Sequence, residues 1–408
     1  MYLIAIKLVE ILARAGFIAG ITYSLGLSAA GQFGLVVTLI GLFALGFGWE
    51  RHIDIQRRMV GEPEPVFDST VAAAMPFWSF NYAVMLPVFL VLAALLARLD
   101  AAQLALAAIV VVSEHIANQA YQLSLVNPRY RVLVNLVAAK NLLVLGITLP
   151  DILFAPSRLT LNFVMTTWAT ASLVSTLAIV TVWFLRRQAS PARTGFSLRK
   201  NIWPQHLVSF THFRIGVVAY LMLQYDRLAV GTFAGLTDSG VYFRHVLLIF
   251  FGYQLFTVAS FNRITPKVFQ AAKTEAIPLL IRTVRREYVI LLAIAIGGAA
   301  LAIVIDLALG GAISAKYHLS VMLAAILLSG TMIRVAADFA GMIVNARHQE
   351  KKLGEAQLIS FAGGGLLLVV LTWWLGIVGA AIANVATSTI YFLLLRRVVR
   401  AMPESPSR

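Results

Sequence analysis

Hydrophobic residues run in long segments along the whole chain, separated by short polar loops. A helix needs about 20 apolar residues to cross a bilayer, and twelve segments meet that length. They span roughly residues 3–25, 31–49, 70–97, 102–125, 132–154, 160–185, 206–235, 240–261, 287–309, 318–345, 354–374 and 377–395. The pattern predicts an all-α, polytopic membrane protein with two groups of six helices.

The basic residues of the loops predict how the helices are oriented. Of the 33 Lys and Arg residues, 23 lie in alternate loops and in the C-terminal tail. These are residues 50–68, 126–131, 186–204, 262–287, 346–352 and the tail from 396. The loops on the other side carry only Arg98, Arg158 and Lys316. By the positive-inside rule, both termini and the basic loops are cytoplasmic, and the basic loop 263–287 is expected to contact anionic membrane lipids.

Composition narrows the class of protein further. Hydrophobic residues make up 60% of the chain and the mean hydropathy is +0.84, which lies outside the range of soluble domains. The net charge of +15 follows from membrane orientation and gives no reason to expect a nucleic-acid partner. The chain has no cysteine, which excludes thiol catalysis, and its seven histidines show no metal-binding spacing. No metal or cofactor is expected.

A short motif occurs twice, half a chain apart. Residues 26–33, Gly-Leu-Ser-Ala-Ala-Gly-Gln-Phe, are echoed at 235–242, Gly-Leu-Thr-Asp-Ser-Gly-Val-Tyr, an offset of 209 residues. Each copy joins the first and second helix of its group, as expected for a duplicated transporter scaffold. We therefore expect an N-terminal lobe over 1–186, a polar cytoplasmic linker over 187–204, and a C-terminal lobe with its tail over 205–408.

Three charged residues of the first half fall deep inside predicted helices. Arg14 lies about 16 Å below the outer end of its helix, near the midplane of the membrane. Glu114 is midway along the fourth segment, and Lys140 is well inside the fifth. Buried charges of this kind usually face a partner or a wet cavity. Lys140 therefore either balances Glu114 as a buried pair or joins Arg14 in a cationic cavity, and the sequence does not separate the two.

Other polar residues of the helices add candidates for coupling and binding. His115 adjoins Glu114, and both belong to a polar stripe that forms proton-coupling machinery, a wall of the substrate path or a helix-packing network. Both are candidates for proton transfer. Asp226 either binds a coupling cation or holds an arginine in place. Arg214 lies near the cytoplasmic interface, where it meets an entering phosphate or a lipid headgroup. Arg244 is expected to snorkel to the outer surface.

One further pair is expected to be structural. Arg334 and Asp338 are spaced i, i+4 on the tenth segment, which favours an intrahelical ion pair.

Three stretches resemble a known family. Residues 225–242 begin Tyr-Asp-Arg and continue through a Gly-rich outer turn to an aromatic start of the next helix. This resembles the seventh-helix signature of bacterial polysaccharide flippases. Residues 25–34 resemble the first outer turn of those proteins, and 376–381 resemble the start of their last helix. The chain is identified as a member of the O-antigen flippase branch of the multidrug, oligosaccharidyl-lipid and polysaccharide exporter superfamily.

The resemblance implies a fold, a substrate and partners. Such proteins have two six-helix lobes in a V and lie in the bacterial inner membrane. They move undecaprenyl-diphosphate-linked oligosaccharide to the periplasmic leaflet through a cationic cavity, driven by a proton or sodium gradient. Arg14 and Lys140 match the cavity role best. A polysaccharide polymerase and a chain-length regulator are the implied partner proteins.

Two alternatives stay open. A multidrug or small-molecule exporter of the same fold is disfavoured because exporters of organic cations need an acidic cavity, and the deep charges here are mainly basic. A membrane enzyme of polysaccharide synthesis, such as a polymerase or glycosyltransferase, is disfavoured because every outer loop is short and nearly uncharged. We therefore predict a transporter, not an enzyme.

Overall fold

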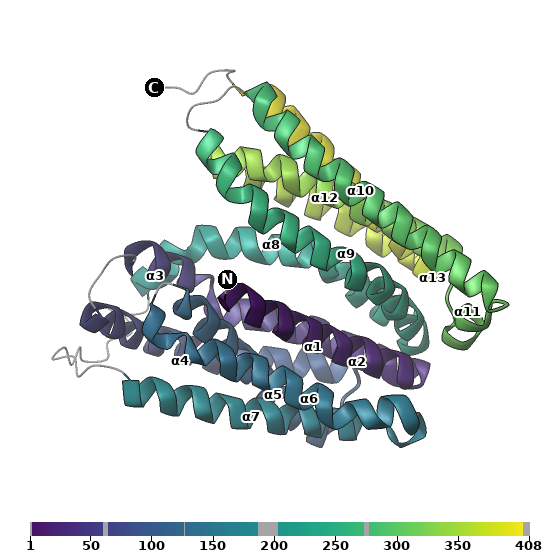
Figure 1. The fold of residues 1–408 in the computed structure, drawn as a ribbon, viewed down its shortest axis with the longest axis horizontal. Helices are drawn as coiled ribbons and strands as arrows, with labels where there is room; N and C mark the ends of the chain where they lie inside the picture. The colour runs from purple at the N-terminus through teal and green to yellow at the C-terminus, as the bar shows by residue number, and fades with distance from the viewer. Residues whose placement is uncertain (1, 60–63, 126, 187–202, 273–276, 403–408) are drawn as a thin grey trace. The chain divides into compact units, whose positions relative to one another are not determined.

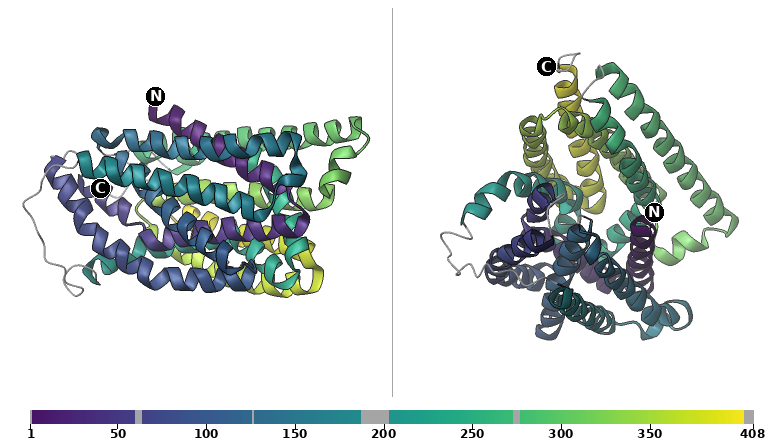
Figure 2. Two further views of the ribbon diagram at one scale, coloured as in Figure 1. Left: turned by 90° about the horizontal axis from the view of Figure 1, so that it is seen from below. Right: turned by 60° about the vertical axis from the view of Figure 1, so that its left-hand side comes forward.

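The computed structural model describes residues 2–59, 64–125, 127–186, 203–272 and 277–402, and these residues form helices joined by short turns. The chain separates into two compact units, residues 1–220 and 221–408. The first half contains α1 (Tyr2–Ser24), α2 (Leu27–Gly48), α3 (Arg51–Met59), α4 (Glu64–Leu96), α5 (Ala101–Ser124), α6 (Val132–Phe154) and α7 (Leu161–Arg186), with short 3₁₀ turns at Pro128–Tyr130 and Pro156–Arg158. The second half contains α8 (Trp203–Phe233), α9 (Leu236–Ala271), α10 (Ile277–Ala308), α11 (Ala312–Tyr317), α12 (Val321–Ala346) and α13 (Glu350–Arg400). Figures 1 and 2 show the long helices of each unit running roughly alongside one another.

The predicted all-α membrane architecture is confirmed. Each of the twelve predicted segments corresponds to a long helix or, for the last two, to one half of α13. The short helices α3 and α11 fall in predicted loops. Among the described residues, eight helices are long and apolar enough to cross a membrane. The chain is a multi-pass membrane protein.

Glycine permits the sharp turn that divides α13. Gly376 has φ 59° and ψ −137°, a combination that only glycine adopts without strain. Beyond this residue the helix folds back, so that the ideal Cβ position of Gly364 on the first half lies within 3 Å of the Thr387 side chain on the second. The predicted eleventh and twelfth spans are therefore two arms of one hairpin. Both arms contact α12, where the ideal Cβ position of Gly341 lies 3.3 Å from Leu353 of the first arm and that of Gly330 lies 2.8 Å from Asn384 of the second.

Both copies of the repeated motif occupy the same structural position. Gly26 is the residue before α2, and Gly235 is the residue before α9. Gly235 has φ +93°, a backbone conformation that other residues rarely adopt. The expectation that each copy joins the first and second helix of its group is confirmed.

Helix packing in the first unit depends on small residues. The ideal Cβ positions of Gly16 and Gly20 on α1 lie 3.6 Å and 2.7 Å from the side chains of Leu145 and Ile152 on α6. Without a side chain at these positions, α1 approaches α6 closely, as is common between membrane helices. This approach places α1 directly beside the polar residues of α5 and α6.

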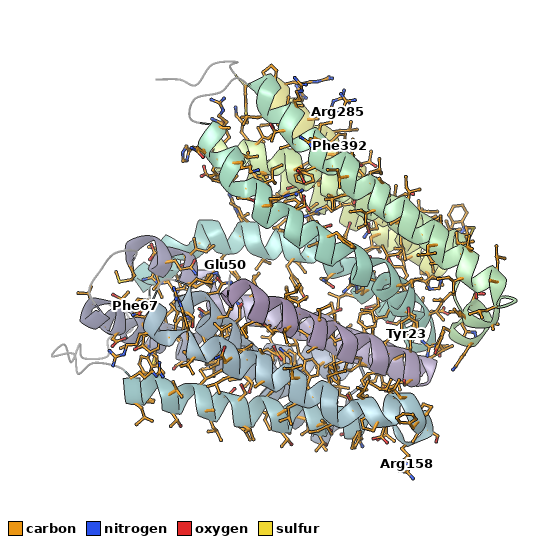
Figure 3. All side chains as sticks on the ribbon, in the orientation of Figure 1. Tyr23, Glu50, Phe67, Arg158, Arg285 and Phe392 are labelled. Atoms are coloured by element: carbon orange, nitrogen blue, oxygen red, sulfur yellow. The ribbon has the colours of Figure 1, made fainter. Side chains whose placement is uncertain are left out.

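The two ends of the first unit differ in the residues that they carry. Figure 3 shows Arg158 at one end, whereas Glu50 and Phe67 lie toward the other. Of the residues in the predicted basic loops, Arg129 and Arg186 lie at the end with Phe67, because Arg186 bonds to the Arg129 carbonyl and the Tyr130 ring stacks on Phe67. This arrangement fits the alternation of helices on which the predicted orientation was based; the orientation itself stays a prediction.

The boundary between the compact units lies inside α8. The first part of this helix packs on the N-terminal unit, where the ring of Phe213 stacks on Trp49 at 4.1 Å and the Tyr220 hydroxyl donates a hydrogen bond of 3.0 Å to the Thr38 carbonyl. The sequence placed the boundary in the linker 187–204, of which residues 187–202 lie outside the described part of the chain. The difference arises because the helix that follows the linker adds its aromatic residues to the core of the first unit.

The predicted basic loop 263–287 is largely helical. The helix α9 extends to Ala271 and includes Arg263 and Lys267, and α10 begins at Ile277 and includes Arg282, Arg285 and Arg286. Its contact with anionic lipids stays a prediction.

Candidate functional site

The carboxylate of Glu114 is the centre of a buried charged cluster in the N-terminal unit. Its Oε1 accepts hydrogen bonds from Lys140 Nζ at 2.6 Å and from Trp168 Nε1 at 3.1 Å. Its Oε2 lies 3.6 Å from Arg14 Nη1. The four residues come from α1, α5, α6 and α7. Of the two readings that the sequence left open, these contacts fit the buried pair of Lys140 with Glu114, and Arg14 joins the same carboxylate. A cationic cavity of Lys140 and Arg14 stays a prediction.

Exposure differs sharply among the three charged side chains. The side chains of Lys140 and Glu114 are 1% and 7% exposed, whereas that of Arg14 is 37% exposed. Two cations and one anion leave a net charge of +1. Lys140 is enclosed and satisfied within the unit, so the guanidinium of Arg14 is the part of the cluster that can meet a ligand.

Aromatic rings enclose the cluster on one side. The rings of Phe17, Phe33 and Trp168 meet edge to face, with centroids 5.7–6.1 Å apart. Burying a charge among such rings is unfavourable unless an opposite charge and hydrogen bonds compensate it. Glu114 obtains this compensation from two cations and the indole N–H, which explains why the cluster persists inside an apolar bundle.

His115 belongs to a different network, although it is the next residue on α5. Its Nδ1 hydrogen-bonds with the Tyr82 hydroxyl, and its Nε2 lies 3.1 Å from Gln119 Nε2. The rings of Phe47, Trp78 and Tyr82 surround it. The structure therefore does not bring His115 and Glu114 together, because adjacent helical residues point about 100° apart.

The C-terminal unit has a polar centre around Asp226. One carboxylate oxygen accepts hydrogen bonds from the Tyr242 hydroxyl at 2.7 Å and from Asn384 Nδ2 at 3.0 Å. The other accepts the backbone N–H of Arg227 at 2.8 Å. The side chain of Arg227 turns away and bonds to Gln224. Both roles predicted for Asp226, binding a coupling cation or holding an arginine in place, stay predictions.

Asp226 lines a cavity of about 180 Å³ within this unit. Arg334 and Asp338 line it too and form the predicted intrahelical ion pair, at 3.1 Å, which is confirmed. The guanidinium of Arg334 also lies over the Tyr391 ring, 4.7 Å from its centroid. Two carboxylates and one guanidinium give the cavity a net charge of −1, opposite in sign to the cluster of the N-terminal unit.

The remaining predicted residues lie elsewhere. Arg214 is exposed on the first part of α8. Arg244 is buried, at 4% exposure, and donates to the Tyr317 carbonyl. Its predicted snorkelling is therefore wrong, because a backbone acceptor near α11 satisfies it inside the unit. No group of three or more metal-ligating side chains occurs within the described ranges.

Sequence reasoning missed several residues of both sites. Three of them, Trp168, Tyr82 and Asn384, lie in apolar segments and carry no unusual spacing. Tyr242 ends the repeated motif, but the motif does not indicate that it binds Asp226. A tryptophan or tyrosine in such a segment is usually a packing residue. Only the fold shows that these side chains meet the buried acids and the histidine.

Comparison with known proteins gives the fold. No family model and no curated protein matches the chain. The solved structure of the lipid II flippase MurJ in an inward closed conformation is similar, with a TM-score of 0.71 at 12% identity over 98% of this chain and 88% of that one. A MATE transporter from Vibrio cholerae has a TM-score of 0.59 at 12% identity, over 98% and 97% of the chains. An inward-facing multidrug resistance MATE transporter of the MOP superfamily has a TM-score of 0.54 at 17% identity, over 96% and 94%. The chain thus has the MurJ and MATE fold.

Proposed function

We propose that the chain is a flippase of the MOP superfamily. In this proposal it moves undecaprenyl-diphosphate-linked oligosaccharide from the cytoplasmic to the periplasmic leaflet of the bacterial inner membrane, by alternating access. The fold supports a transporter, since the similar structures are those of a lipid II flippase and of multidrug transporters. The observation that carries the substrate class is the net positive cluster of Arg14, Glu114 and Lys140.

The proposed roles within the cluster follow from exposure. Arg14, more than a third exposed, contacts the diphosphate. Lys140, almost fully enclosed, acts through Glu114 by keeping the site positive. A guanidinium suits a phosphate because it offers several donors in a fixed planar arrangement. Arg214, exposed on α8, is proposed to meet the diphosphate as it enters.

The cavity of the C-terminal unit is proposed to bind the ion whose gradient drives transport. Asp226 is the proposed site for sodium or for a proton, since its cavity carries net negative charge and oxygen-bearing side chains. Glu114 and His115 were also predicted as coupling groups, but neighbouring side chains already contact their polar atoms. Glu114 already has two cationic partners, and both ring nitrogens of His115 lie within hydrogen-bonding distance of neighbours. We therefore place coupling at Asp226.

The multidrug exporter is the second candidate. The MATE fold favours it, but a cation exporter needs an acidic site that is open to its substrate. The charge of the N-terminal cluster argues for an anionic substrate. A polysaccharide polymerase and a chain-length regulator are the proposed partner proteins.

The test uses export in cells and membrane-fraction immunoblots. Arg14→Ala should abolish export of the surface polysaccharide, at unchanged protein level in the membrane, because the diphosphate loses its exposed cation. Arg158→Ala, in an outer turn, removes the same charge away from the site and is the matched control. Normal export by a well-expressed Arg14→Ala variant would refute the assignment.

Coupling is tested separately, in proteoliposomes with an imposed ion gradient. Asp226→Asn should remove the dependence of transport on that gradient. An Asp226→Asn variant that still responds fully to the gradient would exclude Asp226 as the coupling site.

A further inference from the structure

The N-terminal unit contains a cavity of about 210 Å³, to which the proposed function assigns no role. It lies among α4, α5, α6 and α7. Its walls are almost wholly apolar and rich in aromatic rings: Phe67, Trp78, Tyr82, Tyr130 and Trp183. An apolar cavity of this size inside a membrane protein suits a hydrocarbon ligand.

The cavity opens toward an apolar surface. Met75 of α4 and Val180 of α7 line it and are also 37% and 36% exposed. Leu177 and Phe184, near Val180 on α7, are 59% and 49% exposed. Such large exposed apolar side chains on a membrane helix face lipid. A chain in the bilayer can therefore enter from the side.

Arginines flank the end of the cavity that is expected to be cytoplasmic. Arg186 follows Trp183 on α7, and its Nη1 donates a hydrogen bond of 2.7 Å to the carbonyl of Arg129, next to Tyr130. Arg131 and Arg186 are both exposed. Their charge is complementary to an anionic headgroup attached to a chain inside the cavity.

We propose that this cavity binds the isoprenoid chain of the lipid-linked substrate, in the part nearest the diphosphate. This inference rests on the proposed function and extends it from the head of the substrate to its tail. The broad aromatic walls favour a branched, unsaturated chain over a straight acyl chain. His115 faces this cavity while the adjacent Glu114 faces Arg14, so one helix, α5, carries both the tail site and the head site.

The experiment measures retention of undecaprenyl phosphate by native mass spectrometry of the purified full-length protein. Ala120, a buried wall residue, is replaced by Phe to fill the cavity, and Ala105, an exposed residue of the same helix, is replaced by Phe as the matched control. We expect retention to fall at least tenfold in Ala120→Phe and to stay unchanged in Ala105→Phe. We also expect phosphatidylglycerol in tenfold excess not to displace the isoprenoid. Unchanged retention in Ala120→Phe, or displacement by the phospholipid, would overturn the proposal.

A second measurement covers the case in which Ala120→Phe fails to fold. The chain has no cysteine, so Met75→Cys places a single thiol at the opening of the cavity, where a bulky maleimide can block entry. Labelling should reduce retention of undecaprenyl phosphate, whereas labelling a Leu153→Cys variant, exposed near the other end of the unit, should not. Equal retention after both labels would refute the site. Binding is measured without transport, so normal export by Arg14→Ala would refute the proposed function and leave this result standing.

Discussion

The charged cluster predicts an asymmetry between two substitutions that each remove one member of the same ion pair. Glu114→Gln leaves the ammonium of Lys140 buried, and the structure offers it no second carboxylate within 4 Å among the described residues. Lys140→Met leaves the carboxylate with two partners, Arg14 at 3.6 Å and the indole of Trp168 at 3.1 Å. We expect Glu114→Gln to be the more destabilising change.

The distances set the size of the effect. At 2.6 Å, and at an effective dielectric constant of about 20, the attraction between the two charges is about 6 kcal/mol. Desolvation offsets much of this, and breaking a buried pair by removing one partner typically costs about 3–5 kcal/mol. For a unit of this size that corresponds to a fall in Tm of roughly 6–20 °C. Lys140→Met should cost clearly less.

Intrinsic tryptophan fluorescence during heating provides the assay, because the chain has seven tryptophans. The double variant Glu114→Gln with Lys140→Met should recover much of the stability lost in Glu114→Gln, since it removes the uncompensated ammonium. Lys7→Met is the matched control, because Lys7 pairs with Glu10 at 2.8 Å but is 29% exposed. Equal losses in the two single variants, or no recovery in the double variant, would show that Glu114 does not neutralise Lys140.

Two further predictions concern a turn and a pH dependence. Gly376→Ala should lower the stability of the C-terminal unit by about 1–3 kcal/mol, because alanine is strained at φ 59°; Gly365→Ala, at a helical position with open space around it, should not, and equal thermal shifts would contradict the argument. Burial raises the pKa of Glu50 above its ordinary value of 4.5. The folded state therefore favours the protonated carboxyl, and ionisation of this carboxyl as the pH rises destabilises the fold. Glu50→Gln should therefore raise Tm at pH 7.5 and have no effect below pH 4.5; a gain that is the same at both pH values would exclude titration of Glu50. The nearby His52 does not change this, because burial lowers its pKa to about 4 and leaves it neutral at pH 7.5.

Sequence patterns predicted the helices well because hydropathy and loop charge are local properties. They also identified Arg14, Glu114 and Lys140 as unusual, since a charge in an apolar segment is visible without a structure. They did not decide which residues pair, because that depends on which face each helix turns toward its neighbours. Glu114 and His115 illustrate the limit: one peptide bond separates them, yet they belong to different networks.

The surroundings of Arg244 and of the start of α8 were not visible in the sequence, for the same physical reason. The sequence treated an arginine near a helix end as a residue that reaches water, but the Tyr317 carbonyl lies closer. It likewise placed the boundary of the lobes in the linker 187–204, whereas Phe213, which follows the linker, stacks on Trp49 of the first unit. Long-range contacts of this kind leave no trace in a local pattern.

The hairpin of α13 bears on how the protein is made. With no loop between its arms, the turn at Gly376 gives the insertion machinery no polar segment at which to stop between two spans. The arms are therefore expected to enter the bilayer together, as one unit, and the orientation of the last span depends on the one before it. An epitope tag placed at residue 376 would interrupt this step, whereas a tag after the C-terminal residue would leave it intact.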